Sequence, residues 1–149
     1  MKKTFLLVVI LIIASFVSST AFAGEGPVVP EKIERSFKEN FPDVTEISWQ
    51  KKDDVCIAEF KENTIKHFAY FDADANLLGV LRYINTDYLP FKTISALKSK
   101  YGEFNTVSAL EVSLTGGETF YFISLMHKTK FKTIKVYPDG GTEIVKHKF

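Results

Sequence analysis

The sequence is poor in the residues on which disulfide and metal chemistry depend. Its 149 residues include one cysteine, Cys56, and three histidines, His67, His127 and His147. A single cysteine excludes an intramolecular disulfide. Because Cys56 lies in the apolar run of residues 55–58, we expect it to be a small buried side chain. The histidines lack the close spacing of a typical zinc site, so we expect no metal and no other cofactor.

An excess of charge of either sign is also missing. The chain has 19 basic and 18 acidic side chains, a formal net charge of +1, with the two signs interleaved along its length. Proteins that bind nucleic acids normally present a strongly basic face. We therefore expect no nucleic-acid partner.

The sequence has no apolar run long enough to anchor it in a membrane. Its most apolar stretch, residues 5–16, follows Lys2 and Lys3 and is shorter than the ~20 residues that cross a bilayer. Ala21-Phe22-Ala23 then forms a small-residue cleavage pattern, as in secretory leaders. We expect residues 1–23 to be a signal peptide and residues 24–149 to be a periplasmic or secreted protein with no membrane anchor after cleavage.

Motifs for catalysis are absent as well. The sequence contains no glycine-flanked nucleophile elbow and no glycine-rich phosphate loop. Residues 72–76, Asp-Ala-Asp-Ala-Asn, begin like a calcium loop, but Leu77 and Tyr83 stand where that motif requires glycine and glutamate. We expect a β-turn there, no catalytic residues, and a protein that is not an enzyme.

What the sequence does contain is a helix-and-strand pattern that occurs twice. Apolar residues at Ile33, Phe37 and Phe41 predict a helix over residues 30–41, which Pro42 ends. Strand-like runs follow at 44–50, 54–61, 64–72 and 77–84. Sixty residues further on, a second helix with apolar Phe91, Ile94, Leu97 and Tyr101 precedes strands at 104–114, 118–127, 130–137 and 142–148.

The pattern predicts an α+β fold for residues 24–149, as a single domain made of two repeats. The repeats span about 30–88 and 89–149, each a helix with a four-stranded antiparallel sheet. One helix covers only one face of a sheet, yet the strands near 65–71 and 118–127 are apolar on both faces. Either the repeats pack against each other or a partner covers part of the second face.

The expected function follows from that second face. We expect a non-catalytic binding module that holds a secreted or periplasmic protein or peptide through Tyr70, Tyr83, Tyr121 and Phe122. Trp49, the only tryptophan, is expected in the core near the first helix. The alternative is a small-molecule carrier, with its ligand between sheet and helix or between the two repeats.

A family resemblance agrees with this pattern. Residues 36–44, followed by Ile47-Ser48-Trp49, resemble the opening of the PepSY-like family of secreted Bacteroidetes proteins, and Tyr88-Leu89-Pro90 resembles its later part. The family's fold is similar to that of the β-lactamase inhibitor protein. The resemblance implies a tandem α+β repeat with a curved sheet, and binding or inhibition of secreted proteins, including hydrolases and peptidases. It implies no active site, and the single cysteine excludes that inhibitor's disulfides.

Overall fold

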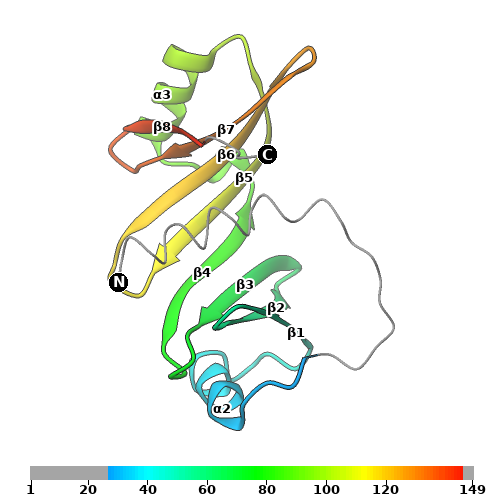
Figure 1. The fold of residues 1–149 in the computed structure, drawn as a ribbon. Helices are drawn as coiled ribbons and strands as arrows, with labels where there is room; N and C mark the ends of the chain where they lie inside the picture. The colour runs from blue at the N-terminus through cyan, green and yellow to red at the C-terminus, as the bar shows by residue number, and fades with distance from the viewer. Residues whose placement is uncertain (1–26, 146–149) are drawn as a thin grey trace.

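The computed structural model describes residues 27–145 (Figure 1), so the expected signal peptide and His147 lie outside the described residues. Its helices are α2 (Glu31–Asn40) and α3 (Phe91–Tyr101), with a short 3-10 helix, η1 (Thr86–Tyr88), before α3. The strands are β1 (Ile47–Lys52), β2 (Val55–Glu62), β3 (Ile65–Phe71), β4 (Leu77–Ile84), β5 (Asn105–Leu114), β6 (Thr119–His127), β7 (Lys130–Val136) and β8 (Thr142–Val145). Within residues 27–145, no helix is long and apolar enough to cross a membrane.

Helix α2 begins at a proline and buries one apolar stripe. Pro30 precedes its first turn, a place where the fixed φ of proline suits a helix start and the missing N–H is not needed. Glu31 and Glu34 lie in that first turn, where a negative charge complements the helix dipole. Ile33 and Phe37 are 1% and 0% exposed. The helix predicted here is confirmed to within one residue at each end.

Helix α3 also starts at its predicted position but buries less of its surface. Thr93 is its one fully buried residue, and Ile94 and Leu97 are partly buried against the sheet. Phe91, which the apolar spacing placed on the buried face, is 82% exposed. That prediction was wrong because Thr93 takes the position facing the end of β7, where its Oγ1 lies 3.5 Å from the carbonyl oxygen of Tyr137.

All eight strands form one antiparallel sheet, and their order in the sheet is their order in the chain. The predicted order of a helix followed by four strands does occur twice, but two four-stranded sheets are not confirmed. The reason is that β4 pairs with β5, from Gly79 opposite Leu114 to Ile84 opposite Ala109. This pairing satisfies the two inner strand edges that separate sheets would leave open.

The first strand lies later in the chain than predicted. It was expected at 44–50 with a turn at residues 51–53, yet Lys51 and Lys52 pair with Cys56 and Val55. The chain reverses after Lys52 instead, where Asp53 has a φ of 53°. Aspartate tolerates this left-handed backbone better than most residues, so a tight turn forms there and β1 extends up to it.

Both helices cover the same face of the sheet. The register aligns Ala69, Val80 and Ser113 across β3, β4 and β5, and Ala69 packs beneath α2. Ser113 shares its side of β5 with Ala109, which packs beneath α3. We call this side the helix-side face and the other side, which neither helix of residues 27–145 covers, the helix-free face. Figure 1 shows the two helices at opposite ends of the molecule, joined by the long strands β4 and β5.

The core on the helix-side face consists of two clusters, one for each helix. Beneath α2, the ring of Phe37 contacts Phe60 at a centroid distance of 5.2 Å and Trp49 at 5.6 Å. Trp49 therefore lies in the core beside the first helix, as predicted. Cys56, 2% exposed, belongs to the same cluster, which confirms the prediction of a small buried side chain. The cluster beneath α3 contains Leu89, Ala109, Tyr121, Ile123, Leu125, Ile134 and Val136.

Candidate binding face

The helix-free face carries an apolar cluster of its own, built from strands alone. Its fully buried members come from β2 to β6, and the residues packed against them come from the strands and from Tyr137 just after β7. The members are Ile57, Phe68, Tyr70, Leu81, Val112, Phe120 and Phe122. Buried apolar side chains on both faces explain why the strand patterns of the sequence lack clean alternation.

The register arranges these side chains in rows that cross both halves of the sheet. One row runs from Glu59 in β2 through Phe68, Leu81 and Val112 to Phe120 in β6. The next row runs from Tyr83 through Leu110, Phe122 and Lys135 to Glu143. A surface formed in this way is shared by the two halves, because each row passes through the β4–β5 pairing.

The structure places three of the four predicted binding residues on this face. Tyr70 and Phe122 are 0% and 2% exposed, and Tyr83 is 40% exposed. Tyr121 points to the helix-side face instead, where it belongs to the cluster beneath α3 and is 6% exposed. Neighbouring residues in a strand face opposite ways, so Tyr121 and Phe122 could not both serve one surface.

The buried tyrosines are kept in their neutral form. Burial raises the pKa of Tyr70 above its usual value, and the nearby Tyr83 raises it further. Burial also raises the pKa of Tyr121, with Glu111 adding to the rise and Arg82 opposing it. Both phenols therefore act as apolar rings with a neutral hydroxyl, a state suited to packing and hydrogen bonding.

Two lysines lie over aromatic rings of the helix-free face. Lys135 is 4% exposed, and its Nζ lies 4.0 Å from the ring centroid of Phe120 and 4.5 Å from that of Tyr137. The hydroxyl of Tyr137 donates to Glu143 Oε1 at 3.1 Å. Ring faces attract cations through their quadrupole, so Phe120 and Tyr137 stabilise the Lys135 ammonium within the sheet.

The second lysine carries an ion pair as well as a ring contact. Lys66 Nζ pairs with Glu59 and lies 5.4 Å from the ring centroid of Phe68. Glu59 and Lys66 are half-buried, and their charges compensate each other. The N-terminal half of the face is therefore locally balanced in charge.

Two exposed residues of this face, Met126 and Phe131, were not among the residues predicted to bind a partner. They pair across β6 and β7, close to the turn between these strands, and are 46% and 58% exposed. A signal for this region was present, since residues 119–138 contain no aspartate or glutamate and four lysines. Two apolar side chains that are exposed side by side next to clustered charge make this hairpin a candidate interaction site.

The remaining polar residues show structural roles. Within residues 27–145, no group of His, Cys, Asp and Glu is arranged to hold a metal ion. At the calcium-like segment, Asp72 Oδ1 accepts hydrogen bonds from the backbone N–H groups of Asp74 and Asn76, which forms the expected turn. Burial raises the pKa of the Cys56 thiol, with Lys51 opposing the rise, so this thiol is a poor nucleophile.

The two histidines inside the described range are held by neighbouring main chain. His67 Nδ1 lies 2.9 Å from the carbonyl oxygen of Ile65, and its ring stacks on Phe60 at a centroid distance of 5.3 Å. His127 Nδ1 lies 2.6 Å from the carbonyl oxygen of Glu103. Each imidazole therefore joins its strand to an adjacent segment of the fold.

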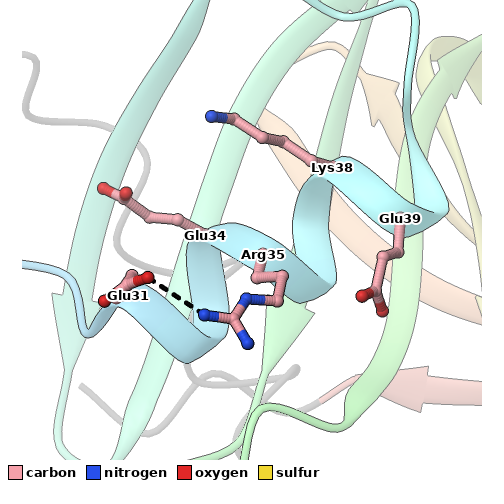
Figure 2. Close-up of a pocket in the computed structure, with 5 residues that line it drawn as sticks. All are labelled: Glu31, Glu34, Arg35, Lys38 and Glu39. Carbon is pink, nitrogen blue, oxygen red and sulfur yellow. Dashed lines mark hydrogen bonds and ion pairs between the residues drawn. The ribbon is translucent and has the colours of Figure 1, made fainter.

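A hollow of about 340 Å³ lies on the outer surface of α2 (Figure 2) and is lined by the charged residues Glu31, Glu34, Arg35, Lys38 and Glu39. Its lining comes from one helix, and the ion pair across it joins Arg35 to Glu31 at 3.0 Å between side chains that are 69% and 86% exposed. Ligand sites are normally enclosed and mostly apolar. This hollow lies outside both places where a carrier's ligand was expected.

No family model matches the sequence, and a search of curated proteins gives no match. Solved structures do match. A DUF2874 family protein from Bacteroides ovatus has a TM-score of 0.74 at 18% identity, over 80% of this chain and 90% of that one. A BLIP-like protein from Bacteroides fragilis has a TM-score of 0.70 at 20% identity, over 83% and 92%. A protein from Bacteroides eggerthii, described as a candidate periplasmic protein, has a TM-score of 0.73 at 15% identity, over 79% and 90%.

Identities at this level establish the fold alone. The chain has an α+β fold similar to that of a BLIP-like protein, where BLIP is the β-lactamase inhibitor protein, and the expected similarity of fold is confirmed to that extent. The matching structures from Bacteroides ovatus and Bacteroides fragilis are described as a DUF2874 family protein and a BLIP-like protein. The PepSY-like assignment stays a prediction.

Proposed function

We propose that this protein is an exported, non-catalytic binding module that holds a protein or peptide partner on its helix-free face. The observation that carries the proposal is the set of large apolar side chains that stay exposed on that face, Tyr83, Met126 and Phe131, on a sheet whose buried apolar cluster spans β2 to β6. Both helices pack elsewhere. Exposed Tyr83, Met126 and Phe131 are the accessible edge of this surface, and aromatic side chains commonly provide most of the energy of an interface.

Export is part of the same proposal. The leader pattern of residues 1–23 predicts passage through the secretory route, and one protein of similar fold is described as a candidate periplasmic protein. The partner is then a protein of the periplasm or the medium. In its sharper form, the module inhibits a secreted hydrolase or peptidase, a hypothesis that the BLIP-like description of another matching structure favours.

The test is capture of a partner by the protein exported with its own leader and tagged at its C-terminus. The exported fraction of the source cells is passed over the immobilised protein, and retained proteins are identified by mass spectrometry. We expect a saturable partner that untagged protein displaces. Inhibition is then measured directly, as loss of the partner's hydrolytic activity on addition of the module.

Two tyrosines provide a matched pair of variants. Tyr83→Ala removes an aromatic ring from the helix-free face, and Tyr88→Ala removes an 82% exposed ring that precedes α3. We expect Tyr83→Ala to weaken partner binding about tenfold or more, as for a residue in an interface, and Tyr88→Ala to leave binding unchanged. Equal effects of the two variants would contradict the assignment to this face. Retention of no protein would favour the small-molecule carrier.

A further inference from the structure

The hairpin formed by β6 and β7 concentrates positive charge. Residues 119–138 contain Lys128, Lys130, Lys132 and Lys135 and no acidic residue. The corresponding hairpin of the first half, β2–β3, contains Lys61 and Lys66 balanced by Glu59 and Glu62. The whole chain has a formal charge of only +1, so the β6–β7 hairpin is a local positive region on a nearly neutral protein.

The same hairpin presents apolar side chains to solvent. Met126 and Phe131 form a cross-strand pair on the helix-free face and are 46% and 58% exposed. Lys128 and Lys130, at the turn beside them, are exposed. Figure 1 shows this hairpin, coloured orange, projecting away from the rest of the sheet near α3. Its tip is therefore accessible from several sides.

The four lysines of the hairpin differ in their contacts with aromatic rings. Lys132 Nζ lies 4.7 Å from the ring centroid of Phe104, and Lys135 lies between Phe120 and Tyr137 deeper in the sheet. Lys135 also stands opposite Glu143 across the β7–β8 pairing, so a carboxylate lies beside its charge. Lys128 and Lys130 are the exposed lysines of the hairpin, and a negatively charged partner would be attracted to them first.

We propose that the β6–β7 tip, formed by Met126, Phe131, Lys128 and Lys130, docks an acidic segment of the partner protein that carries an apolar side chain. The apolar side chain packs on the Met126–Phe131 pair, and the flanking carboxylates pair with the lysines. This inference rests on the proposed function and names the chemistry of the partner. Charge complementarity makes such association fast and sensitive to salt.

The test uses a peptide probe of stated composition. The peptide carries fluorescein and two aspartates on each side of one phenylalanine, and the reference peptide has asparagines in place of the aspartates. Binding to the exported protein is followed by fluorescence polarisation at low and at physiological salt. We expect the acidic peptide to bind more tightly than the reference peptide, and its affinity to fall as salt rises.

Matched variants locate the binding to the tip. Lys128→Glu with Lys130→Glu reverses two exposed charges of the tip, and Lys92→Glu with Lys98→Glu reverses two exposed charges of α3. We expect the double variant Lys128→Glu, Lys130→Glu to weaken binding of the acidic peptide about tenfold or more, because two attractive ion pairs, each of modest strength, are replaced by two repulsions. The double variant Lys92→Glu, Lys98→Glu should have much less effect. Phe131→Ala is expected to weaken binding, while Phe91→Ala, which removes a still more exposed ring from α3, is not.

Three outcomes would overturn the inference: equal binding of the two peptides, equal effects of the two charge reversals, or binding of phosphatidylglycerol vesicles with no binding of the acidic peptide. The last outcome would assign the tip to a membrane surface. Failure of this inference is distinguishable from failure of the proposed function. If Tyr83→Ala abolishes capture of the partner and the tip variants do not, the proposed binding function is upheld and only the inference about the acidic segment is wrong.

Discussion

The two halves of the molecule share an order of elements but hold their helices in different ways. In the first half, α2 inserts Ile33 and Phe37 into an aromatic cluster in which both are fully buried. In the second half, α3 fully buries only Thr93 and lies against the turn between β7 and β8, where Gly140 approaches the carbonyl oxygen of Lys92. Dense apolar packing fixes a helix more firmly than partial burial does, so α2 is the more firmly anchored of the two helices.

The halves also differ in their hairpins. The β2–β3 hairpin has two lysines and two glutamates, while the β6–β7 hairpin has four lysines and no acid up to residue 138. The difference suggests a division of labour within one fold. We expect the first half to contribute more to stability, while the second half presents positive charge and exposed apolar side chains.

The largest expected loss of stability comes from a substitution in the core beneath α2. Phe37→Ala removes a fully buried ring that contacts Phe41, Trp49 and Phe60, and should lower the free energy of unfolding by about 3–5 kcal/mol. Leu97→Ala, at the corresponding place in α3, is only partly buried and should cost about 1–2 kcal/mol. Urea denaturation measures both variants. Equal losses would show that the two helices are equally well anchored.

A smaller effect is expected where the halves join. Gly79 pairs with Tyr70 on one side and Leu114 on the other, and an added Cβ would lie 2.8 Å from the carbonyl oxygen of Ser113. Gly79→Ala should therefore lower the free energy of unfolding by about 1–3 kcal/mol through overpacking. Thermal unfolding followed by circular dichroism measures it. Ser48→Ala, at an exposed strand position, serves as the control and should change stability by less than about 0.5 kcal/mol.

The smallest effect concerns the turn after β3. Burial tends to raise the pKa of Asp72, but hydrogen bonds from Asn76 and Asp74 outweigh it and hold the pKa below its usual value. This carboxylate therefore stabilises the fold fully above its unfolded-state pKa of about 3.9, and the stabilisation is lost as the pH falls through the lower folded-state pKa. Asp72→Asn should cost about 1 kcal/mol at pH 7.

The pH dependence of the difference in unfolding free energy between wild type and Asp72→Asn separates the contribution of the Asp72 carboxylate from the general destabilisation by acid. Urea denaturation of wild type and Asp72→Asn is compared between pH 7 and pH 2, and the difference between them should disappear at the acidic end. Asp74→Asn is the control, because Asp74 contributes its backbone N–H to the turn. A difference that persists at pH 2 would mean that Asp72 acts through its shape and not through its charge.

Most of the fold could be predicted from the sequence because the signals were local. Pro30 and Pro90 mark the two helix starts, and runs rich in Val, Ile, Phe and Tyr mark the strands. The β4–β5 pairing could not be predicted, because α3 separates these two strands in the sequence and no local signal says that they are neighbours in the sheet. Strand β1 was misplaced because Asp53, rather than Lys51 and Lys52, forms the turn.

The candidate site was harder to predict than the fold. Of the four residues predicted to bind a partner, Tyr70, Tyr83 and Phe122 lie on the helix-free face and Tyr121 lies on the helix-side face. The alternation of side chains along a strand places Tyr121 and Phe122 on opposite faces of the sheet. It does not show which of the two faces a helix covers. Exposure was the second difficulty, since Phe91 and Phe131 resemble core residues in sequence and are both exposed. Only the arrangement of the elements in space decides such cases.

The strand order has a consequence for how the chain folds. From β2 to β8, each strand pairs with the strand that precedes it in the sequence. Each pairing therefore forms between strands that are consecutive in the chain. Loops between paired strands are short except where α3 intervenes between β4 and β5, and closing short loops costs little entropy. A chain that emerges from a translocation pore with its N-terminus first could add each strand to a growing edge as that strand appears.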